Sequence, residues 1–404
     1  MQRIERDCVI AGGGPAGIML GLLLARAGLT VTVLEKHADF LRDFRGDTIH
    51  PSTITLLREI GLKEAFLDLP VSVVHTLDIV LDRRRTTLVD FGTLPKPDNF
   101  LVFAPQWDFL SFLVREASKL DGFDLRMSTE ATGLVTENDR VVGVTARGTD
   151  VAYELRAPLT VACDGRTSVL RESSGLEAEE LGVPIDVLWF ALPKPEPTPP
   201  TTLGYMTGSG AVVTLERSGG YQGGMIIPKG GFDALHKRGL EAFRTAVTSI
   251  APVLDTVITS IDSWDQVKLL TVQLNRLPRW YRPGFICIGD AAHAMSPVMG
   301  VGINYALQDA VALANAVVEP LRHGTVPISV LEAVQSRRLP PVKKMQRIQK
   351  LAHDRMSRPF AGAHAVPAPA RAALRLLQPI VRRVVARVVG LGFLPEHIAL
   401  REKK

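Results

Sequence analysis

The stretch Asp7-Cys8-Val9-Ile10-Ala11-Gly12-Gly13-Gly14-Pro15-Ala16-Gly17 decides the fold of this chain. A short apolar run ends at Gly12, and an apolar segment with helical character, residues 18–27, follows Gly17 directly. A strand, a turn with the spacing G-x-G-x-x-G and a helix, in this order, predict a dinucleotide-binding unit. The glycines allow a tight turn and close approach to a pyrophosphate, which the helix N-terminus attracts.

The next strand-like run, residues 30–34, ends at Glu35, eighteen residues beyond Gly17. A carboxylate at this distance accepts hydrogen bonds from a ribose and disfavours a 2′-phosphate. The motif by itself indicates a dinucleotide and no particular reaction. The residues predicted to contact it are Gly12, Gly14, Pro15, Ala16, Gly17, Glu35 and Lys36.

A second polar turn lies almost 280 residues later, in the segment Gly289-Asp290-Ala291-Ala292-His293-Ala294-Met295-Ser296-Pro297-Val298-Met299-Gly300-Val301-Gly302-Ile303-Asn304. It follows the apolar run 285–288 and precedes residues 305–318, whose apolar spacing is helical. One carboxylate, a loop with Pro and Gly, and a new helix N-terminus suit a ligand with sugar hydroxyls, a phosphate and an anionic ring.

A third apolar run, residues 159–163, ends in Asp164-Gly165-Arg166-Thr167-Ser168 and then Arg171. With these three motifs in order, the chain resembles the class A flavoprotein monooxygenases, the p-hydroxybenzoate hydroxylase-like family, over most of residues 1–350. The resemblance implies FAD as cofactor and NADPH or NADH as a transient reductant. It also implies that O₂ and a flavin C4a-hydroperoxide hydroxylate an aromatic, phenolic or polyketide-like small molecule.

The resemblance also implies roles for individual residues. Arg45 and Gln106 match positions that reach the flavin or its phosphates, although relatives often carry Arg at the second. Asp164 is expected to brace its turn, Arg166 to meet an anionic cofactor, and Asp290 to bind a ribityl hydroxyl. The remaining cofactor contacts that it implies are Ala131 near the adenine, Pro297 beside the isoalloxazine, and the backbone of Gly300, Val301, Gly302, Ile303 and Asn304 at the flavin N1–C2=O edge.

The catalytic base, if there is one, cannot be identified from these motifs. His50, His75 and Tyr221 are candidates, and a structural role is favoured for each; His293 is expected to pack at its turn. Trp189, Phe190 and Met225 fit an apolar pocket or a core equally well. Rival activities on the same fold are a flavin-dependent reductase and a halogenase, whose Trp-x-Trp-x-x-Pro box the chain lacks. A flavin-binding protein without turnover is the least favoured alternative.

The 404 residues, 46% of them hydrophobic, can bury a large core and predict two domains. The motifs and the resemblance imply an α/β protein with a discontinuous Rossmann-type FAD-binding domain, residues 1–75, 105–180 and 277–360. Residues 76–104 and 181–276 are predicted to form an inserted, mainly antiparallel substrate domain. A basic helical segment, residues 361–404, follows. Three isolated cysteines, no metal-ligand pattern, a first strand at residue 7 and no bilayer-length apolar run favour a cytoplasmic protein. It is expected to be a monomer or a homodimer.

The charge is distributed unevenly. Residues 335–404 contain sixteen Lys and Arg against three acids, a net charge of +13, which leaves −8 for the remainder of a chain whose total is +5. The favoured interpretation is a solvated basic face against an acidic body. Docking on a membrane surface or a partner is a weaker alternative, and nucleic-acid binding is not indicated.

Overall fold

The computed structural model describes residues 2–41, 48–81, 83–196, 198, 204–217, 219–356 and 380–400. Arg45 and residues 361–379 of the predicted basic segment lie outside these ranges. The expectation of a mixed α/β protein is confirmed, because parallel and antiparallel sheets alternate with helices along the chain.

A six-stranded sheet forms the centre of the part that carries the three motifs. Its strand order is β21-β22-β13-β2-β3-β9, and every neighbouring pair is parallel except β21 with β22. The inner strands are buried along their whole length because both faces of the sheet are covered. The strands are β2 Cys8–Ala11, β3 Val31–Leu34, β9 Phe123–Arg126, β13 Leu159–Ala162, β21 Tyr281–Arg282 and β22 Phe285–Cys287.

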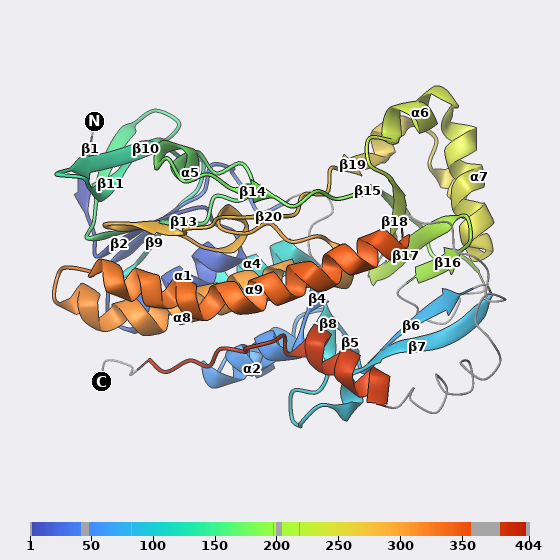
Figure 1. The fold of residues 1–404 in the computed structure, drawn as a ribbon, viewed down its shortest axis with the longest axis horizontal. Coiled ribbons are helices and arrows are strands. Elements are labelled where there is room, and N and C mark those ends of the chain that lie inside the picture. Colours follow the sequence, from blue (N-terminus) through green and yellow to red (C-terminus); the bar gives the residue numbers. More distant parts are fainter. Residues whose placement is uncertain are drawn as a thin grey trace.

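Helices cover one face of this sheet and a smaller sheet covers the other (Figure 1). The long helices α8 and α9 run side by side along the helical face, next to α1. The helices are α1 Pro15–Arg26, α4 Gln106–Ala117, α8 Gly302–Arg322 and α9 Ile328–Met356. The opposite sheet has the order β1-β12-β11-β10, with β1 Gln2–Glu5, β10 Glu130–Glu137, β11 Arg140–Arg147 and β12 Ala152–Arg156.

A seven-stranded sheet of order β19-β15-β18-β17-β16-β6-β7 occupies the other end of the molecule (Figure 1). All its pairs are antiparallel except β16 with β6. Helices α6 Phe232–Lys237 and α7 Leu240–Ile250 pack on one face. The strands are β6 Thr76–Leu81, β7 Arg84–Asp90, β15 Ile185–Leu192, β16 Gly204–Thr207, β17 Gly210–Arg217, β18 Gly220–Pro228 and β19 Lys268–Leu270.

Small elements connect the two large parts. A three-stranded sheet joins β4 Thr48–Ile49, β8 Leu101–Phe103 and β5 Ser72–Val74. Strands β14 Glu179–Glu180 and β20 Asn275–Arg276 form a two-stranded ladder. The short helices are α2 Pro51–Glu59, α3 Lys63–Leu67 and α5 Val169–Ser173.

The end of the chain returns to the motif-carrying part. Residues 380–390 form a helix, and residues 391–400 lack regular structure. This second stretch, hereafter the C-terminal strap, is held by α2 and α8: the backbone N–H of Ile398 donates to Glu59 (2.9 Å), and that of Ala399 donates to Asn315 (3.0 Å). In the described part of the predicted basic segment, residues 380–390 are helical, and beyond them side chains of other elements fix the backbone.

The expectation that no segment is long and apolar enough to span a bilayer was wrong. Residues 298–322, which include α8, meet both criteria, and 83% of their apolar window is buried inside the protein. This burial is explained by the position of α8 between α1 and α9.

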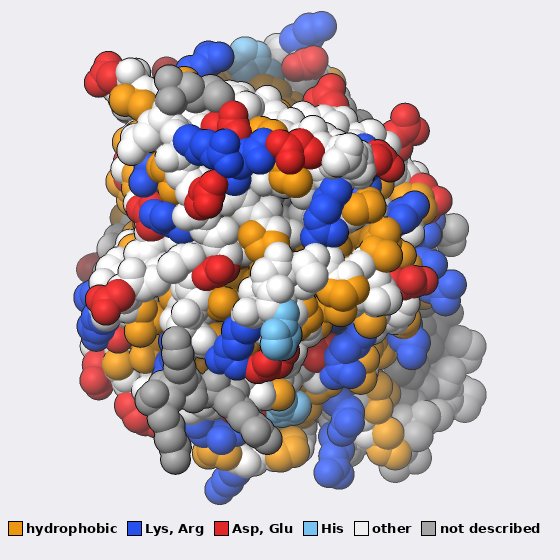
Figure 2. Space-filling model, turned by 90° about the vertical axis from the view of Figure 1, so that its left-hand side faces the viewer, with side chains coloured by type: hydrophobic (Ala, Val, Ile, Leu, Met, Phe, Trp, Pro, Cys, Tyr) orange, Lys and Arg blue, Asp and Glu red, His pale blue; other side chains and the backbone are white. Residues whose placement is uncertain are grey.

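Figure 2 shows an outer face on which Lys and Arg side chains are interspersed with Asp and Glu. Such mixing gives short-range ion pairs, such as that of Arg156 with Glu154 (2.8 Å).

Candidate functional site

The glycine turn between β2 and α1 is shaped by close backbone contacts. Gly12 has φ +105°, and a Cβ there would lie 2.3 Å from the carbonyl oxygen of Cys163 at the end of β13. A Cβ at Gly17 would lie 2.0 Å from the carbonyl oxygen of Gly12. At Gly14, by contrast, a Cβ would meet nothing within 4 Å, so the turn has one open side.

Helix α1 starts at this open turn without a side-chain cap. Pro15 has no N–H, and Ile18 is the first residue to donate back, to Gly14 (3.0 Å). The N–H groups of Ala16 and Gly17 therefore have no partner within the helix, and the positive end of the helix dipole lies with them. This is the arrangement that binds a phosphate group.

Glu35 closes the turn from the end of β3. Its carboxylate accepts hydrogen bonds from the backbone N–H of Gly13 (2.9 Å) and of His37 (3.0 Å), and the residue is 8% exposed. The carboxylate is thus held beside the glycine turn, where the sequence predicted a ribose contact. Lys36, the next residue, is exposed.

An ion pair joins the middle motif to the C-terminal motif. Arg166 donates from Nε to Asp290 Oδ2 (3.0 Å) and from Nη2 to the carbonyl of Met295 (3.3 Å). Asp164 accepts from Ser168 Oγ (2.5 Å) and from the backbone N–H of Leu170 (3.2 Å), which braces its turn. Burial raises the pKa of Asp164. Arg166, expected to meet a cofactor, has Asp290 as its partner here.

The C-terminal motif touches the glycine turn. A Cβ added to Gly289 would lie 3.3 Å from the Cβ of Ala16. The loop then runs through two short 3₁₀ turns, Gly289–Ala291 and Val298–Gly300. Met299 (φ +72°) and Gly300 (φ +63°) are both left-handed, and for a non-glycine residue this costs about 1–2 kcal/mol. Helix α8 begins at Gly302, again without a side-chain cap, so its first N–H groups have no partner in the helix.

Asn304 connects this loop to the segment around β4 and α2. Its Oδ1 accepts from the backbone N–H of His50 (3.0 Å) and from Thr53 Oγ1 (2.7 Å). Its Nδ2 donates to the carbonyl of Thr48 (3.3 Å), while Thr48 Oγ1 donates to the carbonyl of Gly300 (2.9 Å). The side chain of Asn304 is therefore occupied by main-chain and hydroxyl partners from residues 48–53.

Of the three base candidates, the structure brings only His50 to this loop. Its ring is 1% exposed, and its Nδ1 lies 2.7 Å from the carbonyl of Val389, to which it donates. His75 is exposed and lies beside Asn99. Tyr221 is buried among the residues that pack against α7, and burial raises the pKa of its phenol, which makes it a poorer base at neutral pH.

His50 should make stability depend on pH. Burial lowers its pKa from 6.5 to about 4, so the unfolded chain binds a proton at pH values where the folded chain does not. The free energy of unfolding should therefore fall as pH drops through this window, by about 2 kcal/mol between pH 7 and pH 5. Urea unfolding at the two pH values checks this. His50→Leu should lose that part of the dependence; an unchanged dependence in the variant would exclude His50 as its source.

The seven-stranded sheet turns a mixed apolar and aromatic face toward the motif-carrying part. Trp189, Val213 and Leu215 belong to one buried cluster with Phe103 and Val389. The other face packs on α7 and contains Phe190, Tyr221 and Met225. Of the predicted pocket residues, therefore, only Trp189 lies on the inner face.

A cation and an amide lie at the end of this inner face. The guanidinium of Arg217 lies 5.0 Å from the ring centroid of Trp107 and donates to Gln222, which is 3% exposed. Trp107 follows Gln106, the first residue of α4. The phosphate-contact candidate Gln106 is thus half-buried at the junction between the two parts. Ala131 is buried in β10, paired with Ala146.

A buried charge network, unnoticed in the sequence, lies behind the C-terminal motif. Asp309 is fully buried and accepts from Gly289 N–H (3.1 Å), His293 Nε2 (2.6 Å) and Arg338 Nε (2.9 Å). Its charged partners hold the pKa of Asp309 below the usual value, against the opposing effect of burial. His293 thus packs at the turn, as expected. Arg338 also reaches Glu396 of the C-terminal strap (3.2 Å).

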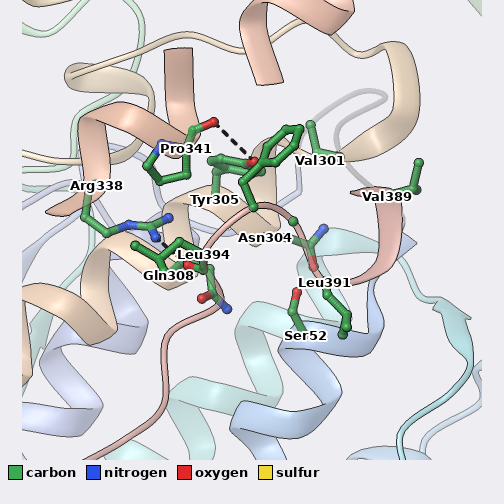
Figure 3. A pocket seen from close by; sticks show the side chains of 12 residues that line it. Ser52, Val301, Asn304, Tyr305, Gln308, Arg338, Pro341, Val389, Leu391 and Leu394 are labelled. Carbon is green, nitrogen blue, oxygen red and sulfur yellow. Dashed lines mark hydrogen bonds between the residues drawn. The ribbon is translucent and has the colours of Figure 1, made fainter. Parts of the chain in front are cut away.

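A small pocket lies beside this network (Figure 3). The Tyr305 ring and Arg338 approach each other across it, with the guanidinium 5.9 Å from the ring centroid. Leu391 and Leu394 of the C-terminal strap close one side. Asn304 is one of the lining residues, and the other walls come from α2, α8, α9 and the segment 389–394.

The arrangement fits a dinucleotide cofactor with a flavin ring. Strands β2, β13 and β22 are neighbours, so their carboxyl ends place the glycine turn, Asp164 and Asp290 at one edge of the sheet. Two uncapped helix N-termini, those of α1 and α8, supply N–H groups there. One suits a pyrophosphate and the other an anionic ring edge.

Comparison with known proteins gives consistent matches. The family described as FAD binding domain matches residues 5–349. The 6-methylpretetramide 4-monooxygenase of Streptomyces rimosus is 32% identical over 387 residues, covering 95% of this chain and 91% of that protein. The tetracenomycin B2 monooxygenase-dioxygenase of Streptomyces olivaceus is 25% identical over 372 residues, covering 84% and 67%. The structure of the OxyS anhydrotetracycline hydroxylase from Streptomyces rimosus has a TM-score of 0.75 at 24% identity, covering 96% and 76%.

Proposed function

This chain belongs to the FAD-binding domain family, and it is a class A flavoprotein monooxygenase that uses FAD and NAD(P)H. We propose that it hydroxylates a fused-ring phenol of the polyketide type. The proposal for the substrate is supported by the relatives named for 6-methylpretetramide and tetracenomycin B2. The ring of Trp189, which is only partly buried on the inner face of the seven-stranded sheet, supports it independently, because flat aromatic ligands stack on such rings.

One observation carries the assignment of the cofactor site. The three turns at Gly12, Asp164 and Gly289 are spread over more than 270 residues of chain, yet they lie next to one another. A Cβ at Gly12 would collide with Cys163, and one at Gly289 would contact Ala16. Neighbouring parallel strands bring the three turns to one edge of the sheet, and a dinucleotide has the shape of a ligand that spans all three.

We assign the following roles to the residues of this site. The N-terminus of α1 binds the pyrophosphate, and Glu35 binds a ribose. Asp290, oriented by Arg166, accepts a hydrogen bond from a ribityl hydroxyl. The N–H groups at the start of α8 stabilise negative charge on the ring edge in the manner of an oxyanion hole. When bound, FAD supplies the electron and oxygen chemistry, and the protein orients the substrate and excludes water.

The predicted division into domains follows from the same assignment. Residues 1–75, 105–180 and 277–360 form the cofactor domain, and residues 76–104 and 181–276 the substrate domain. The inner face of the seven-stranded sheet, with Trp189 and Leu215, then lies opposite the loop that precedes α8. Arg217 and Gln222 offer a cation and an amide to an oxygen anion, and a deprotonated phenol is the more reactive substrate.

The test uses purified protein reconstituted with FAD. NADPH or NADH oxidation and O₂ uptake are measured in air with fused-ring phenols, single-ring phenols and no addition. Fused-ring phenols should stimulate O₂ uptake and yield a product heavier by one oxygen atom. Stimulation by single-ring phenols alone would refute the proposed substrate class. A halogenated product in the presence of bromide would favour the halogenase alternative, and reduction of a double bond without O₂ would favour the reductase.

A further inference from the structure

The loop that precedes α8 is held by three side chains from one face of α9. Gln346, Gln349 and His353 are spaced three and four residues apart, so they lie on one side of the helix. All three are buried, with exposures of 1%, 0% and 0%. Buried polar side chains at this spacing need partners, and here every partner is in or beside the loop.

Most of their bonds are to the main chain. Gln346 Nε2 donates to the carbonyls of Asn275 (2.7 Å) and Ala294 (3.2 Å). Gln349 Nε2 donates to the carbonyls of Ser296 (3.0 Å) and Val298 (3.0 Å), and its Oε1 accepts from the N–H of Ser296 (3.2 Å). Residues 294–298 thus obtain from α9 the hydrogen bonds that a strand would obtain from its neighbour.

His353 completes the set through a hydroxyl. Its Nε2 lies 2.7 Å from Ser296 Oγ, and the same Oγ accepts from the N–H of Val298 (3.1 Å). Burial lowers the pKa of His353, which favours the neutral ring. In that form, Ser296 can donate its proton to Nε2 while it accepts from Val298.

The segment held in this way leads into a strained turn. Met299 and Gly300 are both left-handed, and the N–H groups of residues 301–304 follow immediately. A left-handed methionine persists only where its surroundings fix the backbone on both sides. On one side this is done by Gln349 and His353, and on the other by Thr48 and Asn304, which both bond the carbonyl of Gly300 (2.9 and 3.4 Å).

We propose that Gln349, His353 and Ser296 are positioning residues for the flavin. They act through the loop, aiming the N–H groups at the start of α8 at the ring edge. This inference rests on the role proposed above for that helix N-terminus, and it is independent of the substrate. Because the reduced ring is the more negative, misaligned N–H groups should weaken binding of reduced FAD more than of oxidised FAD.

The decisive variant is Gln349→Met, which keeps the volume and removes the three bonds to Ser296 and Val298. Its matched control is Gln335→Met, because Gln335 is also on α9 and bonds a loop main chain, at Trp280 N–H (2.8 Å) and the Pro278 carbonyl (2.9 Å). Dissociation constants of oxidised FAD are measured by fluorescence titration, and the midpoint potential gives those of the reduced form. In Gln349→Met the ratio of reduced to oxidised dissociation constants should rise about tenfold, as for the loss of one hydrogen bond to a charged group.

Three further variants keep the test decisive if Gln349→Met does not fold. Ser296→Ala removes one hydroxyl, and it should shift the ratio in the same direction. His353→Phe should do so too, whereas His353→Gln, which can still bond Ser296, should keep the wild-type ratio. Amide exchange of residues 294–298 in the protein without FAD should accelerate in Gln349→Met, Ser296→Ala and His353→Phe, and stay unchanged in Gln335→Met. Faster exchange with an unchanged ratio would refute the positioning role, even if the protein hydroxylates fused-ring phenols as proposed.

Discussion

Replacing Gly12 by Ala should unfold the cofactor site. The added Cβ would lie 2.3 Å from the carbonyl oxygen of Cys163, a backbone atom that cannot turn away, and φ at this position is +105°. Left-handed strain and the collision together should lower the free energy of unfolding by at least about 3 kcal/mol. Urea unfolding of the protein without FAD measures this directly, and FAD binding should be lost with it.

The variant Gly14→Ala distinguishes an effect on folding stability from an effect on FAD affinity. A Cβ at Gly14 meets nothing within 4 Å, so stability without FAD should fall by no more than about 1 kcal/mol, the cost of alanine at a helix N-cap. The new methyl group would nevertheless project into the open side of the turn, where the pyrophosphate is proposed to pass. We expect FAD affinity to fall at least about tenfold. Wild-type affinity in Gly14→Ala would contradict this placement of the pyrophosphate.

Arg338→Met should be the most destabilising change in the helical layer. Arg338 is 1% exposed and bonds Asp309, the carbonyl of Leu394 and Glu396. Its loss leaves two buried carboxylates short of a partner, which typically costs about 3–5 kcal/mol. The C-terminal strap should also loosen around residues 394–396, because Leu394 and Glu396 lose their bonds to Arg338. Urea unfolding and limited proteolysis near the C-terminus report the two effects.

The neighbouring residue provides a control for this prediction. Arg337 also bonds Glu396 (2.8 Å), but its side chain is half-exposed. Arg337→Met should therefore cost about 1 kcal/mol or less. The double variant Arg338→Met/Asp309→Asn should recover part of the loss, since it removes one of the uncompensated charges. Equal losses in Arg337→Met and Arg338→Met would show that burial of the network does not matter.

Sequence patterns predicted strands and turns correctly where neighbouring residues alone determine the backbone conformation. The strands ending at Gly12, Asp164 and Gly289 were predicted because each is a short apolar run followed by a glycine or an acid. Their adjacency, and membership in the flavoprotein monooxygenases, followed from the combination of motifs. The turn geometry itself, such as the contact of Gly12 with Cys163, needed the structure, because it depends on the register of β2 with β13.

The supporting residues could not be predicted because their partners are distant in the chain. Gln349 bonds Ser296 across 53 residues, and Glu396 bonds Arg338 across 58. In α9, Gln346, Gln349 and His353 occupy one face at helical spacing, which is a pattern visible in the sequence. A polar helix face is ordinarily exposed to solvent, however, so the pattern by itself predicts no internal contact. Only burial reveals that this face is internal. For Tyr221 and Met225, the alternation of β18 placed both on the face away from the cofactor motifs, and nothing local indicates which face is inner.

The C-terminal strap completes the charge network behind the cofactor site late in synthesis. The glycine turn is made first, and Gly289, Asp309 and Glu396 follow more than 270 residues later. Contacts this distant in sequence form slowly, and the bond between Arg338 and Glu396 cannot form before residue 396 has been made. Chains that terminate before residue 396 should therefore lack this bond and be cleaved faster by protease in the segment around Arg338.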